Sequence, residues 1–277
     1  MVNQIRPLSQ YTTVLHSFAI KISRFEFPAG LVYLMVKPGR HEVKDPDAAF
    51  DCTIKSKLKM RISVILAHPD EHSFNHAIAH AAVEQLGSSG HKVFFHDLYK
   101  EKFDPLLTMQ EILEGAHVPE QIMRHCREIA NARGIVVVHP NWWGQPPAIL
   151  KGWIDRVLRA GVAYEFVEGD SGEGIPNGLL KAGTAMVFNT SNTETEREKN
   201  VFGDPIETIW RNCIFGLCGV TGFYRRTFSV IVTSTADQRR QWLDEVRRSI
   251  DTFFPKSGNT AAPYNNQLHR SATKEPG

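Results

Sequence analysis

Residues 134–158 read Gly-Ile-Val-Val-Val-His-Pro-Asn-Trp-Trp-Gly-Gln-Pro-Pro-Ala-Ile-Leu-Lys-Gly-Trp-Ile-Asp-Arg-Val-Leu. The uninterrupted apolar run at residues 135–138 is typical of a strand that is buried on both faces. Residues 147–158 then carry apolar side chains at helical spacing: Ile149, Leu150, Trp153, Ile154 and Val157. A buried strand, a loop and an amphipathic helix in succession form the repeating unit of an α/β fold.

The same alternation extends in both directions from this unit. Residues 62–66, 92–97, 184–188 and 228–232 are the other predicted strands. Helices are predicted around residues 74–86, 119–132, 205–217 and 236–254. We therefore predict a flavodoxin-like α/β fold, a five-stranded parallel sheet in the order 2-1-3-4-5 with helices on both faces.

The chain divides into three parts of different composition. Residues 1–59 carry nine Lys and Arg against five Asp and Glu, and their apolar residues follow no sustained period. Residues 60–255 hold the whole alternating pattern, so we expect the flavodoxin-like domain to begin at Met60. Residues 256–277 contain one Leu, one Tyr and no Val, Ile or Phe, so we expect a disordered tail.

Composition excludes several classes of protein. The 32 Lys and Arg nearly balance the 30 Asp and Glu, which gives no global case for a nucleic-acid partner. The longest apolar stretch near the N-terminus has about ten residues, whereas a membrane span needs roughly 20. Four Cys without a Cys-x-x-Cys pair do not make a disulfide scaffold. We expect a cytoplasmic protein with reduced thiols and no membrane span.

Ligands of such sheets bind beyond the carboxyl ends of the strands, so we expect the site in the loops after strands one, three and four. The first loop is His-Pro-Asp-Glu-His-Ser-Phe-Asn at residues 68–75. Ser73 and Asn75 stand where a helix begins, where they either cap that helix or hold a phosphate with its free N–H groups. The dinucleotide Gly-x-Gly-x-x-Gly motif and the Walker loop are both absent.

The same loop also suggests a metal. His-Pro-Asp-Glu resembles the zinc-binding start of the sugar N-deacetylases, which implies His68 and Glu71 as ligands and Asp70 as the base. The later His-x-x-His pair of that family is missing from the chain. His76 and His80 lie four residues apart and could share a metal, but we interpret them as solvent-facing and predict no metal site.

The third loop, residues 139–147, holds two adjacent Trp closed by Gly and two Pro. Aromatic residues on a loop expose apolar area that needs a partner, and a flat, partly polar ring system would suit Trp142 and Trp143. Gly144 lets the backbone approach such a ring closely. The alternative is a structural aromatic cluster or a dimer contact.

These residues carry a family resemblance. His68 with Ser73-Phe74-Asn75, together with residues 143–157, resembles the NAD(P)H:quinone reductases of the flavodoxin-2 group. That group also holds drug-activity modulators and ancillary flavoproteins of potassium-efflux systems. The resemblance covers residues 60–254 and implies a homodimer with a flavin, FAD or FMN, at each of two interface sites.

The resemblance implies thirteen site residues. The phosphate and ribityl contacts would be His68, Ser73, Phe74 and Asn75. The edge of the isoalloxazine ring would meet Pro140, Asn141, Trp142, Trp143 and Gly144. The pyrimidine side would meet Thr190, Ser191, Asn192 and Thr193. The Tyr and His that the family places nearer the ring are absent from residues 194–203.

The implied activity is a ping-pong transfer of hydride from NADH or NADPH through flavin N5 to a quinone-like acceptor. No side chain is predicted to be catalytic, because the flavin carries the hydride. Two alternatives stay open at this point: a flavin-bearing regulatory subunit of a potassium-efflux system, and the zinc-dependent N-deacetylase.

Overall fold

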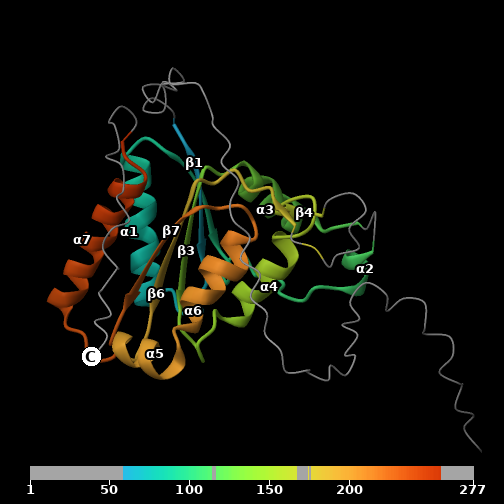
Figure 1. Ribbon diagram of the computed structural model, residues 1–277. Helices are drawn as coiled ribbons and strands as arrows, with labels where there is room; N and C mark the ends of the chain where they lie inside the picture. The colour runs from blue at the N-terminus through green and yellow to red at the C-terminus, as the bar shows by residue number, and fades with distance from the viewer. Residues whose placement is uncertain (1–58, 114–116, 167–173, 175, 257–277) are drawn as a thin grey trace, which may run out of the picture.

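The computed structural model describes residues 59–113, 117–166, 174 and 176–256. Its main sheet is parallel and runs in the order β2-β1-β3-β6-β7 (Figure 1). The strands are β1 (Arg61–Leu66), β2 (Lys92–Asp97), β3 (Gly134–Pro140), β6 (Thr184–Thr190) and β7 (Gly222–Phe228). In chain order this is 2-1-3-4-5, so the predicted topology is confirmed. The predictions for residues 1–58 and 257–277 lie outside the described residues.

Helices cover both faces of the sheet (Figure 1). One face packs against α1 (Phe74–Ser88) and α7 (Ala236–Phe253). The other packs against α3 (Glu120–Asn131), α4 (Ala148–Val157) and a π-helical segment, η3 (Ile209–Gly216). The remaining elements are short: α2 (Met109–Ile112), α5 (Thr195–Phe202), α6 (Pro205–Thr208) and the antiparallel pair β4 (Tyr164–Glu165) and β5 (Asn177–Gly178). No described helix has the length and apolarity that a membrane span requires.

The period of two along each strand divides the core into two clusters. Val136 and Val138 of β3 face α1 and α7, whereas Ile135 and Val137 face α3 and α4. Every residue of β3 is buried, which explains its continuous apolar run. Burial of each such side chain contributes about 1.5–3 kcal/mol, so this strand anchors the loop that follows it.

The fifth strand was wrongly predicted at residues 228–232. The strand is β7, an edge strand of sequence Gly-Phe-Tyr-Arg-Arg-Thr-Phe that is mostly half-buried. Its two Arg point to opposite faces, where Arg225 pairs with Glu207 at 2.7 Å and Arg226 pairs with Glu245 at 2.6 Å. The apolar residues after Phe228 form a turn instead. These ion pairs let a charged sequence occupy a strand between two helical layers.

Two other stretches also differ from the prediction. The helix predicted at residues 205–217 consists of α6 followed by η3, and α5 was not predicted at all. Gly203 ends α5 with φ of 71°, and Asp204 then caps α6 through its side chain. This Gly-Asp junction produces two short helices, and α5 turns toward the loops at the carboxyl edge of the sheet (Figure 1).

Candidate functional site

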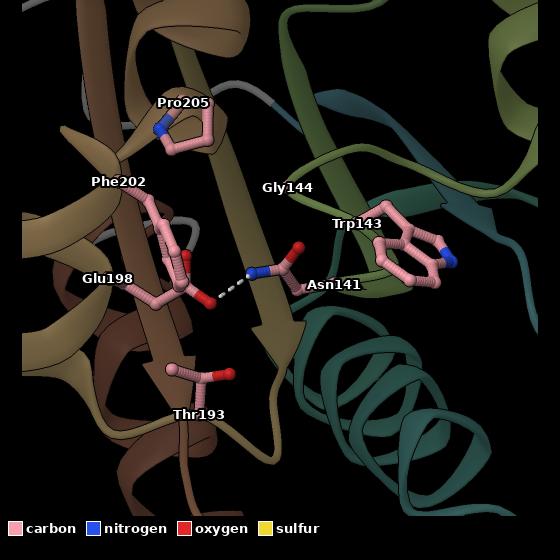
Figure 2. A pocket seen from close by; sticks show the side chains of 7 residues that line it. All are labelled: Asn141, Trp143, Gly144, Thr193, Glu198, Phe202 and Pro205. Atoms are coloured by element: carbon pink, nitrogen blue, oxygen red, sulfur yellow. Dashed lines mark hydrogen bonds between the residues drawn. The ribbon is translucent and has the colours of Figure 1, made fainter.

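Two neighbouring cavities lie at the carboxyl edge of the sheet. The first has a volume of about 460 Å³ and is lined by Asn141, Trp143, Gly144, Thr193, Glu198, Phe202 and Pro205 (Figure 2). The second has a volume of about 470 Å³, and its lining includes the loops after β1, β3, β6 and β7 together with α7. Asn141 and Thr193 line both cavities, so the two adjoin.

All thirteen residues predicted for the site line one or both cavities. Those in the second are His68, Ser73, Phe74, Asn75, Pro140, Asn141, Trp142, Thr190, Ser191, Asn192 and Thr193. Trp143 and Gly144 line the first, with Asn141 and Thr193. Three loops that are distant in sequence therefore bring the whole predicted set to one edge of the sheet. The two cavities divide these residues into two groups.

The second cavity presents donors suited to an anion. Ser73 caps α1 by accepting from the backbone N–H of His76, and the other N–H groups of the first turn have no partner within the helix. Nδ1 of His68 lies 3.1 Å from the backbone N–H of Asp70 and 3.2 Å from its carbonyl oxygen, so the backbone of Asp70 holds the ring in place and leaves Nε2 without a part in either contact. Burial lowers the pKa of His68, which favours the neutral ring. Arg239 of α7 adds a fixed positive charge.

Side-chain hydrogen bonds hold the loops of the second cavity together. Asn75 donates to Oγ1 of Thr190 at 3.0 Å, which ties the start of α1 to the end of β6. The hydroxyl of Ser191 accepts from the backbone N–H of Thr193 at 3.0 Å. The side-chain oxygen of Asn192 accepts from the N–H of Val232 at 3.0 Å. The polar residues after β6 therefore fix neighbouring loops as well as line the cavity.

A tight turn forms the wall of the first cavity. Trp142 and Gln145 exchange two backbone hydrogen bonds, at 3.1 and 3.0 Å. Between them Trp143 has φ of 58° and Gly144 has φ of 72°, both in the left-handed region. The turn leaves the Trp143 side chain fully exposed at the rim of the cavity, directed away from Asn141 and Glu198 (Figure 2). A Cβ on Gly144 would stand 2.9 Å from Cγ of Pro205, so only glycine lets these two walls meet.

The polar part of the first cavity is a pair of facing side chains. Asn141 donates from Nδ2 to Oε1 of Glu198 at 3.0 Å (Figure 2). Its other amide atom, Oδ1, is buried without a hydrogen-bond partner. A buried acceptor left unpaired costs about 1–3 kcal/mol, which a ligand with an N–H group would recover. Glu198 comes from the unpredicted helix α5 and is also largely buried.

A buried histidine stands directly before this loop. Nδ1 of His139 lies 2.8 Å from the carbonyl oxygen of Pro140, which can only accept, so Nδ1 carries the hydrogen. Nε2 then accepts from the indole N–H of Trp210 at 2.9 Å. Burial lowers the pKa of His139 to about 4. The ring is therefore neutral and serves as a fixed support for the loop rather than as an acid or base.

Several cavity residues escaped prediction. Glu198 and Pro205 line the first cavity, and Asp70, His72, Ile231 and Arg239 line the second. Ile231 was missed because the fifth strand was placed over the loop that carries it, whereas Arg239 lies on α7, a helix that was predicted without any sign that this side chain reaches the cavity. Three large aromatic residues, Phe202, Trp210 and Phe215, follow in this part of the chain. The latter two are buried, but Phe202 is about half exposed and lines the first cavity.

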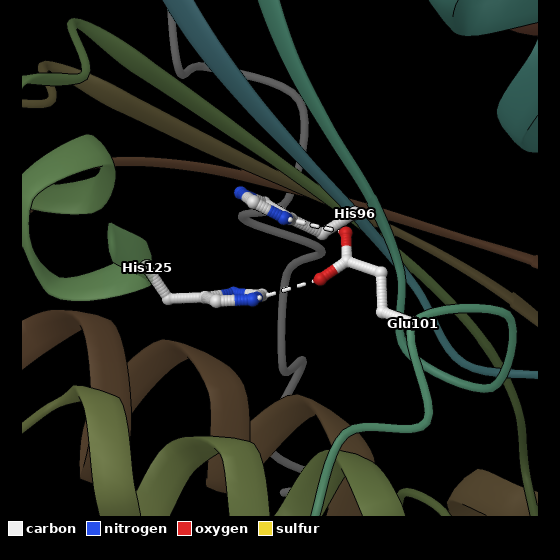
Figure 3. A group of neighbouring side chains, drawn as sticks. All are labelled: His96, Glu101 and His125. Atoms are coloured by element: carbon white, nitrogen blue, oxygen red, sulfur yellow. Dashed lines mark hydrogen bonds and ion pairs between the residues drawn. The ribbon is translucent and has the colours of Figure 1, made fainter. Parts of the chain in front are cut away.

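The prediction for the two histidines of α1 is half wrong. His80 is exposed as expected, whereas His76 is buried. Among the described residues, a three-ligand grouping occurs at His96, Glu101 and His125, remote in sequence from the His-Pro-Asp-Glu loop (Figure 3). The carboxylate of Glu101 bonds His96 at 2.9 Å and His125 at 3.0 Å.

This three-residue grouping fits a hydrogen-bonded network better than a metal centre. Trp153 donates to Nδ1 of His125 at 3.0 Å, so that nitrogen carries no hydrogen. A metal ligated by Nε2 would need a hydrogen on Nδ1, which is where a ligating histidine normally donates to an acceptor. Burial opposes the charge of Glu101, but hydrogen bonds from His125 and His96 outweigh it and lower the pKa of Glu101 to about 2.

Comparison with known proteins agrees with this architecture. Residues 60–254 match the family model of the flavodoxin-2 proteins, described as having a flavodoxin-like fold. A Haemophilus influenzae protein named as an uncharacterized NAD(P)H oxidoreductase is 35% identical over 161 residues, covering 57% of this chain and 77% of its own. NAD(P)H dehydrogenase [quinone] 1 of Rattus norvegicus is 28% identical over 227 residues, covering 73% and 81%.

Solved structures give the same result. The NAD(P)H:quinone oxidoreductase of Methanothermobacter marburgensis superposes with a TM-score of 0.61 at 26% identity. The match covers 70% of this chain and 96% of that protein. Since the family model spans well over half of the sequence, and the sheet order and the match agree, the chain belongs to the flavodoxin-2 family, the group that contains the NAD(P)H:quinone reductases.

Proposed function

We propose that this protein is a flavin-dependent NAD(P)H:quinone oxidoreductase. The observation that carries the proposal is the pair of adjoining cavities lined by all thirteen predicted flavin-site residues. One cavity is walled by the Trp143–Gly144 turn and holds an unpaired acceptor, and the other is rich in donors for an anion. A flavin has the same division, since its ring system and its phosphate lie at opposite ends of the ribityl chain. The names of the relatives support this activity.

The residues present fit the cofactor. Ser73, the N–H groups of the first turn of α1, His68 and Arg239 would hold the phosphate. The turn at Trp143 and Gly144 would lie along the ring edge, and Oδ1 of Asn141 would accept from a ring N–H. Bound there, a flavin supplies the capacity to take a hydride from a reduced nicotinamide and to pass two electrons to a quinone.

The protein contributes position and charge. Gly144 removes the Cβ that would close the first cavity against Pro205. The Asn141–Glu198 pair forms a polar edge of the first cavity. The carboxylate of Glu198 would lie close to a ring that gains negative charge on reduction, so the two would repel each other. Because a single ring cavity would receive the donor and the acceptor in turn, we expect ping-pong kinetics.

Three finer points are part of the proposal. The exposed rim of the first cavity, with Trp143 fully exposed and Phe202 half exposed, supports a homodimer in which a second copy covers the ring. We expect a cytoplasmic protein. The flavin is FMN or FAD, and the donor is NADH or NADPH.

The test combines flavin content with steady-state kinetics. Purified protein should carry one flavin per chain, or bind one on titration. It should reduce simple quinones with NADH or NADPH as the electron donor. Double-reciprocal plots at several acceptor concentrations should be parallel. Flavin binding without quinone turnover would favour the regulatory subunit, and stoichiometric zinc without flavin would overturn the proposal.

A further inference from the structure

A chain of three side chains leads from the second cavity into the protein. Oγ of Ser73 lies 3.1 Å from Nδ1 of His76, and Nε2 of His76 lies 3.1 Å from Oδ2 of Asp97. Ser73 lines the cavity, whereas the side chains of His76 and Asp97 are only 8% and 11% exposed. The chain therefore links a cavity-facing hydroxyl on α1 to a buried carboxylate on β2.

The direction of these hydrogen bonds depends on the proton count of His76. The carboxylate of Asp97 can only accept, so Nε2 of His76 carries a hydrogen. In the neutral ring Nδ1 is then an acceptor, and the hydroxyl of Ser73 donates its hydrogen bond to His76. In the protonated ring Nδ1–H donates to Ser73 instead, and the hydroxyl hydrogen is released toward the cavity. One proton on His76 thus converts Ser73 from an acceptor for a ligand into a donor.

The surroundings of His76 allow this change. Among the described residues, Asp97 of β2 is the carboxylate that pairs with it. The rings of His68, after β1, and His80, one turn along α1, each lie 6.4 Å away. Beyond Ser73, the cavity also holds His72, Arg239 and Asp70, whose Oδ1 is engaged by the backbone N–H of His72.

We propose that Ser73, His76 and Asp97 form a proton-linked phosphate relay, in which a phosphate group binds the second cavity together with a proton on His76. The inference rests on the proposed function, because the phosphate is that of the flavin. A phosphate dianion accepts from Ser73 and offsets the charge gained by His76, while Asp97 holds the protonated ring in place. His76 and Asp97 are thus positioning residues, since neither lines the cavity.

The first test needs only the wild-type protein. Binding of FMN, FAD and riboflavin to apoprotein is measured by calorimetry at pH 7.5 in two buffers that differ in ionisation enthalpy. The relay predicts net proton uptake of a fraction up to one per site with FMN or FAD, and none with riboflavin, which lacks phosphate. Equal proton counts for riboflavin and the phosphorylated flavins would overturn the relay and leave the proposed function intact. If none of the three flavins bound, the proposed function itself would fail.

Variants then assign the proton. His76→Gln and Asp97→Asn should each weaken binding of the phosphorylated flavin by about 10-fold, the loss of one charge-assisted hydrogen bond, and abolish the proton uptake. Riboflavin affinity should not change. His80→Gln is the matched control on the same helix and should bind all three flavins as wild type does. If uptake persists in Asp97→Asn, or in a folded His76→Gln, the proton resides elsewhere and the relay is wrong.

Discussion

The indole nitrogen of Trp210 donates to Nε2 of His139 at 2.9 Å. His139 is the residue immediately before the loop Pro140–Gly144. Both side chains are completely buried. The bond joins η3 to the end of β3, and it fixes the tautomer of His139 so that Nδ1–H holds the carbonyl of Pro140. The position of the cavity wall thus depends on a histidine that must stay neutral.

This pair predicts an acid-sensitive fold. Burial lowers the pKa of His139 to about 4, below the ordinary value of 6.5 that it regains on unfolding. The unfolded state therefore binds the proton first, and the stability from this group is complete above pH 6.5 and lost as pH falls toward 4. The loss amounts to roughly 3 kcal/mol. The free energy of unfolding, measured in urea from pH 7 to pH 4, should decline less steeply in His139→Gln than in wild type. In the control His80→Gln it should decline as steeply as in wild type. Equal slopes for all three would contradict this assignment.

A second acid transition should arise at Glu101, in a lower range of pH. Its pKa is lowered to about 2, so its contribution is present above the unfolded value of 4.5 and lost as pH falls from there toward 2. Glu101→Gln should cost about 2 kcal/mol at pH 7, because the bonds to His96 and His125 lose their charge. The difference from wild type should vanish near pH 2. Glu120→Gln, which alters an exposed pair with Arg127, should leave the unfolding curve unchanged.

Gly144→Val should weaken flavin binding by about 5- to 150-fold, or roughly 1–3 kcal/mol. The new side chain would meet Pro205 and strain a backbone that has φ of 72°. Gly161 offers a matched control, because its φ is 76° and nothing lies within 4 Å of a Cβ there. Both variants should melt at a lower temperature as apoprotein, but only Gly144→Val should lose affinity on flavin titration. A lowered melting temperature with unchanged affinity in Gly144→Val would remove this loop from the site.

A chain that starts at Met60 should fold and bind flavin. The family match begins at residue 60, and β1, an interior strand of the sheet, begins at Arg61. The measurements are circular dichroism and flavin titration of the shortened chain beside the full chain. An insoluble or flavin-free product would show that residues 1–59 are part of the fold. A loss of dimerisation alone would assign them to the interface.

The sequence sufficed for the sheet order because the central strands are apolar throughout. Residues 135–138 and 185–188 are buried on both faces, so their composition alone identified them. The edge strand β7 was missed because Arg225 and Arg226 are neutralised by Glu207 and Glu245, partners that only the tertiary fold brings near. An edge strand need not be apolar when its charges meet such partners.

The candidate site divides in the same way. Residues from the loops after the first, third and fourth strands were predictable, because parallel strands end at one edge. Glu198 was not, since α5 has few apolar residues and its place in the cavity depends on the Gly203–Asp204 junction. Arg239 belongs to a helix whose charged face gives no local sign of which Arg reaches the cavity. The burial of His76 in α1 likewise has no signal in sequence, because its partner Asp97 comes from a different element, β2.

The most direct test of the account is the position of flavin in a crystal structure of the complex. We predict electron density for the ring in the first cavity, between Gly144 and the Asn141–Glu198 pair, with the phosphate within hydrogen-bond distance of Ser73 in the second. Flavin density outside these two cavities, or both cavities empty at saturating flavin, would contradict it.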